Sequence, residues 1–269
     1  MEFDLAELRE EAADSLDILF DDAFPEVLAE GTVEELVGLV REACVHFHTQ
    51  GVTTLLLDGS PQYFFYHLGC AAENWRRLLI HLRTRGAALP PASDNAPLLG
   101  AVAAGYWELA RDLCRVSSSE RGEDEYEDEF AWAHLLQELV VLPEGGTFSP
   151  EFLRQHERVL AETQPDRLEV FQSLLAGDRS RFLAALERLL QQHGEETEAQ
   201  AARMGTSPDQ FVAYRFIWFE GLALLRLAER GGMKIDEPLL YCPPLARVPM
   251  KMAYDGDWAL PFEASPAPR

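Results

Sequence analysis

Basic residues are scarce in this sequence. Lysine and arginine together number 23 against 46 aspartates and glutamates, and the net charge is −23. A surface with this charge repels nucleic acid and anionic membranes, so neither is expected as a partner. A cationic protein is the natural complement, although acidity that serves only solubility remains an open alternative.

Cysteine is also scarce, and long apolar runs are missing. The cysteines have neither the CxxC spacing of a zinc or redox site nor the density of a secreted disulfide scaffold. We expect buried thiols in a reducing compartment; the four positions are Cys44, Cys70, Cys114 and Cys242. No stretch approaches the roughly 18 apolar residues of a membrane span. Because Met1 to Asp4 lacks the basic start of a signal peptide, the cytoplasm is the expected location.

Catalytic motifs are absent as well. The chain contains no G-x-S-x-G turn, no phosphate-binding glycine loop and no H-E-x-x-H. His46 and His48 are two residues apart, which puts their rings on different faces of a helix, whereas zinc ligands on one helix need a spacing of three or four. We therefore expect no catalytic residue, metal site or cofactor, and an enzyme is the minority interpretation.

Helical periodicity dominates what is present. One apolar stripe predicts a first helix over about residues 4–20, and Thr32 with Glu35 forms a capping-box pattern that starts a second helix ending near residue 50. Ser60-Pro61 begins a third helix that stops at Gly86. The run 52–57 is interpreted as a loop or short helical turn. Further helices are expected at about 97–116, 126–142, 150–163, 166–176, 178–193, 195–204 and 208–231.

The chain is therefore expected to be all-α, a multi-helix array of antiparallel helical hairpins. A single helical domain over 1–246 is expected, with a possible subdivision near 87–97 or 143–149. Past Gly231-Gly232, frequent proline excludes a long helix. This predicts an extended Pro-rich tail over 247–269 with a frayed end, held on the helices by Tyr241, Tyr254, Trp258 and Phe262.

Two aromatic runs, 63–66 and 214–219, are too dense for one buried stripe. Three consecutive helical residues span about 200°, so some of these rings must face away from a single neighbouring helix. The favoured interpretation places the runs in helices surrounded on all sides. In the alternative, part of the ring surface meets a partner.

Acidic residues gather in two clusters. Residues 1–35 hold thirteen carboxylates and a single base, Arg9, and a second cluster spans 120–129. Crowded like charge is unfavourable and would be relieved by a cationic partner, although solvated acids that favour a helix N-terminus are the alternative. The candidate partner-binding residues are Glu120, Glu123, Asp124, Glu125, Glu127 and Asp128, together with Glu10, Asp14, Asp17 and Asp21.

Several segments together resemble the immunity-protein-49 family of bacterial polymorphic-toxin systems. They are 125–136 (EYEDEFAWAHLL), 173–182 (SLLAGDRSRF), 226–236 (RLAERGGMKID) and 240–245 (LYCPPL). The last helix, closing on an aspartate and a Tyr-Pro segment, is also similar to the immunity partners of PoNe nuclease toxins.

The resemblance implies a non-enzymatic immunity protein that binds a cognate toxin and holds it inactive by occlusion. A nuclease toxin would fit the carboxylates, because acids can stand in for phosphates in a cationic cleft. A helical scaffold or adaptor that binds a peptide or protein partner is the alternative.

Overall fold

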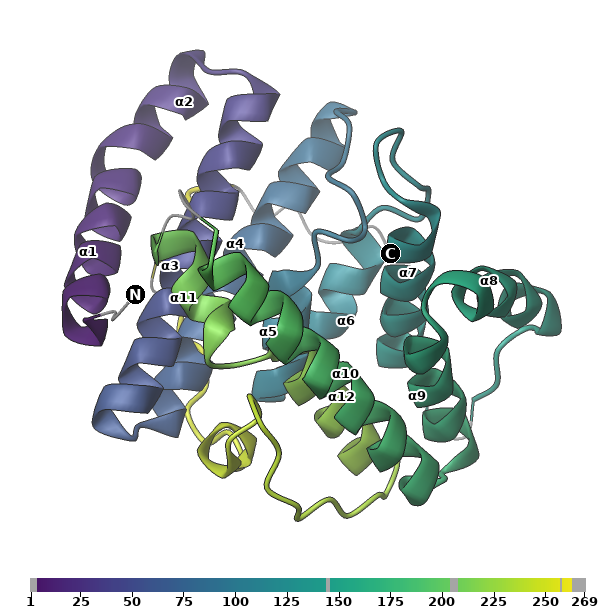
Figure 1. Cartoon of the computed structure of the whole chain (residues 1–269). Coiled ribbons are helices and arrows are strands. Elements are labelled where there is room, and N and C mark those ends of the chain that lie inside the picture. The colour runs from purple at the N-terminus through teal and green to yellow at the C-terminus, as the bar shows by residue number, and fades with distance from the viewer. Residues whose placement is uncertain (1–3, 144–145, 204–207, 257, 263–269) are drawn as a thin grey trace.

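The computed structural model describes residues 4–143, 146–203, 208–256 and 258–262. Within these ranges the chain is an array of packed helices without a β-strand, and its one bridge joins Leu239 and Cys242 (Figure 1). The predicted all-α class is confirmed.

The N-terminal arm consists of α1 (Leu5–Ile18), a π-helical turn (Leu19–Ala23) and α2 (Phe24–Glu30). The side chain of Asp4 caps α1 by accepting hydrogen bonds from the first backbone N–H groups. The predicted stripe is buried against α3, and the acids lie on the opposite, exposed face. The helix expected over 4–20 is therefore present, and the π-helical turn connects it directly to α2.

The long hairpin of α3 (Val33–Asp58) and α4 (Pro61–Arg85) forms the centre of the first half. The capping box of Thr32 and Glu35 is present. The interpretation of 52–57 as a loop or short turn was wrong, because these residues form the last turns of α3. Val52 and Leu55 are buried, and the hydroxyl of Thr53 donates to the carbonyl of Thr49 at 2.7 Å. Tertiary packing thus overrides the weak helix preference of a Val-Thr-Thr run.

The helix expected over 97–116 is two helices, α5 (Ala96–Ala104) and α6 (Trp107–Val116). Gly105 separates them in the left-handed region, at φ 85°, a conformation that glycine adopts without strain. The break turns the chain and leaves α5 buried between α4 and α12 (Phe219–Arg230). Its all-apolar sequence suits this enclosed position.

The second half contains α7 (Glu127–Val141), α8 (Pro150–Thr163), α9 (Pro165–Ala176), α10 (Arg179–Ala201) and α11 (Pro208–Arg215). The two helices expected over 178–193 and 195–204 are one, α10, and the helix expected over 208–231 is two. A Cβ on Gly194 would lie 3.0 Å from the hydroxyl of Tyr241. Gly194 therefore allows close packing within α10. The break between α11 and α12 includes Trp218, whose backbone N–H donates to the Tyr241 carbonyl at 2.9 Å.

After α12 the chain runs extended over the helices, with one 3-10 turn at Pro244–Arg247. Tyr241, Tyr254 and Phe262 pack on the core, and the ring of Trp258 meets Phe20 edge-on at 5.3 Å. Asn74 fixes the segment further, because its amide donates to the Trp258 carbonyl and accepts from the Leu260 N–H. The extended tail is confirmed as far as residue 262, and its expected frayed end lies outside the described residues.

The two aromatic runs are mostly enclosed. Phe64 and Phe65 are fully buried and Phe219 is 3% exposed, whereas Tyr63 is 54% exposed. The interpretation of an enclosed helix therefore fits the first run apart from Tyr63, which faces outward. The second run does not lie in one helix, because it spans the junction between α11 and α12.

Gly221→Ala is expected to lower the free energy of unfolding by about 1–3 kcal/mol, the usual cost of overpacking. A Cβ there would lie 2.2 Å from Cε3 of Trp218 and 2.9 Å from Sγ of Cys242. Gly38→Ala is the matched control: it lies in α3 with nothing within 4 Å of an added Cβ, and alanine should stabilise it by about 0.5–1 kcal/mol. Urea unfolding of both variants measures the difference, and equal stability would contradict the close packing.

Candidate protein interface

The second acidic cluster lies on the loop between α6 and α7 and on the first turn of α7. The side chains of Glu120, Glu123, Asp124 and Glu127 are exposed, and none of them has a cationic partner among the described residues. Tyr126, in their midst, is 73% exposed. An exposed tyrosine among uncompensated carboxylates has the composition of a protein-binding surface.

Glu125 differs from its neighbours because it is only 6% exposed. Its carboxylate accepts hydrogen bonds from the backbone N–H of Ser93 at 2.7 Å and of Gly122 at 3.0 Å. It thereby ties the acidic loop to the 87–97 connection. Glu125 therefore holds the acidic loop in place and is not itself exposed to a partner. The sequence had grouped it with the partner-binding acids.

The first acidic cluster lies elsewhere. Glu10, Asp14, Asp17 and Asp21 are exposed on the outer side of the N-terminal arm. That arm packs on α3, whereas α7 packs on α6 and α8, and the two lie on opposite sides of the view in Figure 1. The structure therefore does not bring the two predicted clusters together.

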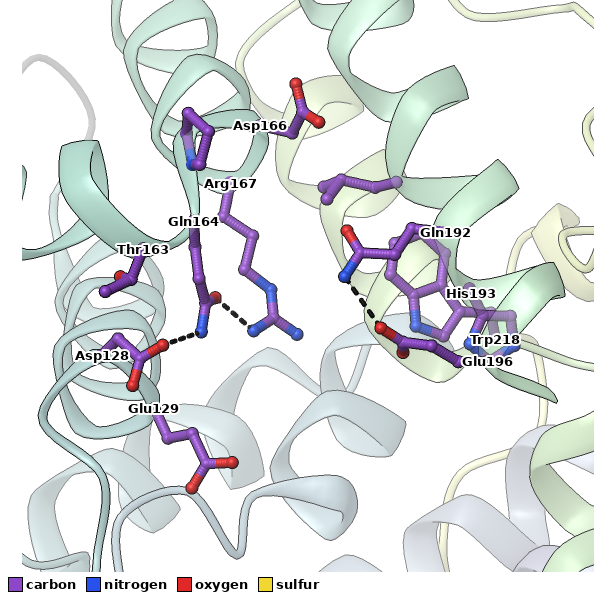
Figure 2. A pocket seen from close by; sticks show the side chains of 12 residues that line it. Asp128, Glu129, Thr163, Gln164, Asp166, Arg167, Gln192, His193, Glu196 and Trp218 are labelled. Atoms are coloured by element: carbon purple, nitrogen blue, oxygen red, sulfur yellow. Dashed lines mark hydrogen bonds between the residues drawn. The ribbon is translucent and has the colours of Figure 1, made fainter. Parts of the chain in front are cut away.

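A pocket of about 440 Å³ opens beside the first turn of α7. The start of α7, the junction of α8 and α9, and α10 form its walls, as Figure 2 shows. Four carboxylates line it: Asp128, Glu129, Asp166 and Glu196. We call this site the acid pocket; its one lining guanidinium is that of Arg167.

A chain of hydrogen bonds forms one side of the acid pocket. Arg167 pairs with Glu220 through two bonds of 3.0 and 2.8 Å, and the indole N–H of Trp132 donates to the same carboxylate at 2.9 Å. Arg167 also donates to Gln164, whose amide donates to Asp128 at 2.7 Å. The charge of Arg167 is therefore already neutralised by Glu220, and Asp128 is held in place.

The opposite side of the acid pocket is aromatic. The rings of His193 and Trp218 stack at 5.2 Å with an interplanar angle of 20°, and Tyr241 meets His193 edge-on. On α10, Gln192 donates to Glu196 at 2.8 Å (Figure 2). Burial lowers the pKa of His193, although a hydrogen bond with the Tyr214 backbone and the nearby Glu220 and Glu196 oppose this shift. The His193 ring on this side is therefore largely uncharged at neutral pH.

Asp128 is the one residue of the acid pocket among the predicted partner-binding residues, and the other lining residues were not predicted. Gln164, Arg167, Glu196 and Trp218 come from three separate segments, and no spacing pattern relates them. The only local signal for these residues was the Gln164-Pro165 helix start, which marks the end of α8 and the beginning of α9.

Three of the histidines, His48, His134 and His156, serve packing. His156 donates from Nδ1 to the Phe152 carbonyl, which leaves its Nε2 to accept from Nδ1 of His134 at 3.2 Å. His48 is fully buried, with Nδ1 2.9 Å from the Tyr214 hydroxyl. Across the described ranges, no group of three or more His, Cys, Asp or Glu residues is arranged to hold a metal ion.

The cysteines are unreactive by environment. Cys44, Cys70 and Cys242 are buried, Cys114 is partly buried, and all four are free thiols. Burial raises the pKa of Cys114 and of Cys242 to about 12. Because the thiolate is the nucleophilic form, neither residue is suited to covalent chemistry.

Acidification is expected to destabilise the fold through buried histidines. Burial lowers the pKa of His48 to about 3 and of His67 to about 4, from 6.5. Below pH 6.5 the unfolded chain therefore takes up these protons first, and stability is lost as the pH falls toward the folded-state values. At about pH 5 each histidine should cost roughly 2 kcal/mol, since one pKa unit corresponds to about 1.4 kcal/mol.

Urea unfolding at about pH 7.5 and about pH 5 measures this loss. His48→Asn is the informative variant, because asparagine can keep a polar contact with the Tyr214 hydroxyl but does not titrate. The variant should lose less stability on acidification than the parent protein. Identical pH dependence of the two proteins would contradict the assignment to His48.

No helix within the described residues is both long enough and apolar enough to cross a membrane. The fold and the site together define an all-helical, acidic protein whose candidate interface carries exposed carboxylates. The chain belongs to the Immunity protein 49 family, which it matches over residues 95–245. No curated protein and no solved structure matches it.

The matched region runs from the residue before α5 to the 3-10 turn after α12. It contains the acidic α6–α7 loop and every residue of the acid pocket, whereas α1 to α4 lie outside it. Membership indicates an immunity protein, a role that does not call for catalysis.

Proposed function

We propose that this protein binds a cognate bacterial toxin and neutralises it by occlusion, without enzymatic turnover. Membership in the Immunity protein 49 family supports an immunity role. The observation that carries the binding proposal is the group of exposed carboxylates without cationic partners among the described residues: Glu120, Glu123, Asp124 and Glu127. Such uncompensated charge is unfavourable in the free protein and becomes favourable against a cationic surface.

The proposed contact surface is the second acidic cluster together with the acid pocket. Both lie within the region matched to the family, and they adjoin each other at the first turn of α7. The acids of α1 lie apart from this surface, so we assign them to long-range attraction of the partner. They would raise the rate of encounter without adding a contact.

A nuclease is the toxin chemistry that we favour. An enzyme that binds nucleic acid carries a cationic cleft, and carboxylates on an inhibitor can occupy the positions of phosphates. The proposed place of action is the cytoplasm, where a reducing environment keeps the four thiols free.

Co-expression tests the proposal. The toxin encoded beside this gene is produced in a host cell with and without the protein, and growth is followed. We expect the toxin-producing cells to grow only when the protein is also present, and we expect the two proteins to co-purify as a complex. Cells that die in the presence of the folded protein, with no complex formed, would contradict the proposal.

A further inference from the structure

We propose that the acid pocket receives an arginine side chain of the partner protein. This inference rests on the proposed function, under which the arginine belongs to the toxin.

The charge balance of the acid pocket favours a cation. Two of its charged groups are already paired: Arg167 with Glu220, and Asp166 with Arg188 outside the pocket. Asp128 and Glu196 each accept only a neutral amide, and Glu129 has no hydrogen-bond partner in the described part of the chain. Three carboxylates therefore face a cavity of about 440 Å³ without a counter-charge.

The placement of these carboxylates suits a guanidinium. Asp128 and Glu129 project from α7, and Glu196 approaches from α10 on the other side (Figure 2). A guanidinium offers five N–H donors in a plane and can bond carboxylates on more than one edge, whereas an ammonium is a compact point charge. A site with acceptors on opposite walls therefore discriminates in favour of arginine.

The aromatic wall supports the same choice. His193 and Trp218 stack face to face and line the pocket, and Nε2 of His193 is enclosed without a hydrogen-bond partner among the described residues. A planar cation gains from lying against an aromatic surface, and arginine does so more often than lysine. The acid pocket therefore provides both carboxylates and an aromatic surface for the same arginine side chain.

The surroundings of the acid pocket indicate that the arginine comes from a protein. Tyr126 precedes α7 by one residue, is 73% exposed and stands between the acids Glu125 and Glu127. Interfaces concentrate their binding energy in tyrosine, tryptophan and arginine around a pocket. An exposed tyrosine next to the pocket supplies the flanking contact that a free amino acid would not need.

Titration with N-acetyl-arginine amide tests the proposal directly. The indole N–H resonance of Trp218 in the full chain is followed by NMR. We expect a saturable shift, much weaker with the lysine analogue and absent with the citrulline analogue, which has the shape of arginine without its charge. The variant Glu129→Gln with Glu196→Gln should abolish the shift; glutamine at 196 keeps an acceptor for Gln192. An equal shift with citrulline, an undiminished shift in that variant, or no shift would overturn the proposal.

Binding to the neighbouring toxin separates this inference from the proposed function. The same double variant should bind the toxin roughly 30-fold more weakly, an effect within the range of close charge pairs. The control, Glu151→Gln with Glu187→Gln, removes the same charge from exposed sites outside the pocket and should change affinity little. Full toxin binding by the Glu129/Glu196 variant would refute the arginine pocket and leave the proposed function standing. A toxin that the parent protein does not bind would refute the function itself.

Discussion

Converting Glu120, Glu123, Asp124 and Glu127 to their amides is expected to slow association with the toxin roughly 100-fold at low salt. All four side chains are exposed and unpaired among the described residues, so the change removes charge without removing a fold contact. Electrostatic steering accounts for about this difference between charged and neutral protein pairs. Stopped-flow association at several salt concentrations measures the rate.

The matched control carries the same number of changes at exposed acids far apart on the surface: Glu108, Glu151, Glu187 and Asp236. It has the same net charge, so it should slow association much less if position matters. The rate of the parent protein should fall steeply with added salt, because screening weakens attraction between exposed charges. Equal slowing by both variants would mean that overall acidity, and not this cluster, attracts the toxin.

Arg167→Met is expected to lower the free energy of unfolding by about 3 kcal/mol, because it leaves the mostly buried carboxylate of Glu220 without its counter-charge. For a chain of this size the melting temperature should fall by roughly 10 °C. Thermal and urea unfolding both measure the change.

The rescue variant adds Glu220→Gln to Arg167→Met. Glutamine has no charge to leave unpaired and still offers an acceptor for the Trp132 N–H. Most of the lost stability should return, and a double-mutant cycle isolates the pair. A double variant less stable than Arg167→Met alone would show that the pair stabilises by something other than mutual neutralisation.

Local sequence patterns predicted the helix ends well where a single capping residue, proline or glycine determines the end. The capping box at Thr32, the Pro61 start and the glycine stop at Gly86 all lie where the sequence indicated. Two of the errors concern glycines that have opposite effects on the helix. Gly105 ends a helix in the left-handed region, whereas Gly194 continues one because Tyr241 packs against it.

The candidate site could be predicted only in part, for a related reason. Charge density marked the cluster around residue 125 because it is a property of consecutive residues. It could not show that Glu125 turns inward, since that depends on Ser93, 32 residues away. The acid pocket needed the structure, because Arg167 and Glu220 meet across 53 residues of chain.

Titrating the purified toxin with this protein tests the central claim most directly. If the protein neutralises by occlusion, toxin activity should fall in proportion to the amount added and vanish near one protein per toxin, with both chains recovered intact from the complex. Complete inactivation by a small fraction of that amount would indicate turnover by an enzyme. Undiminished toxin activity in excess protein would contradict the immunity function.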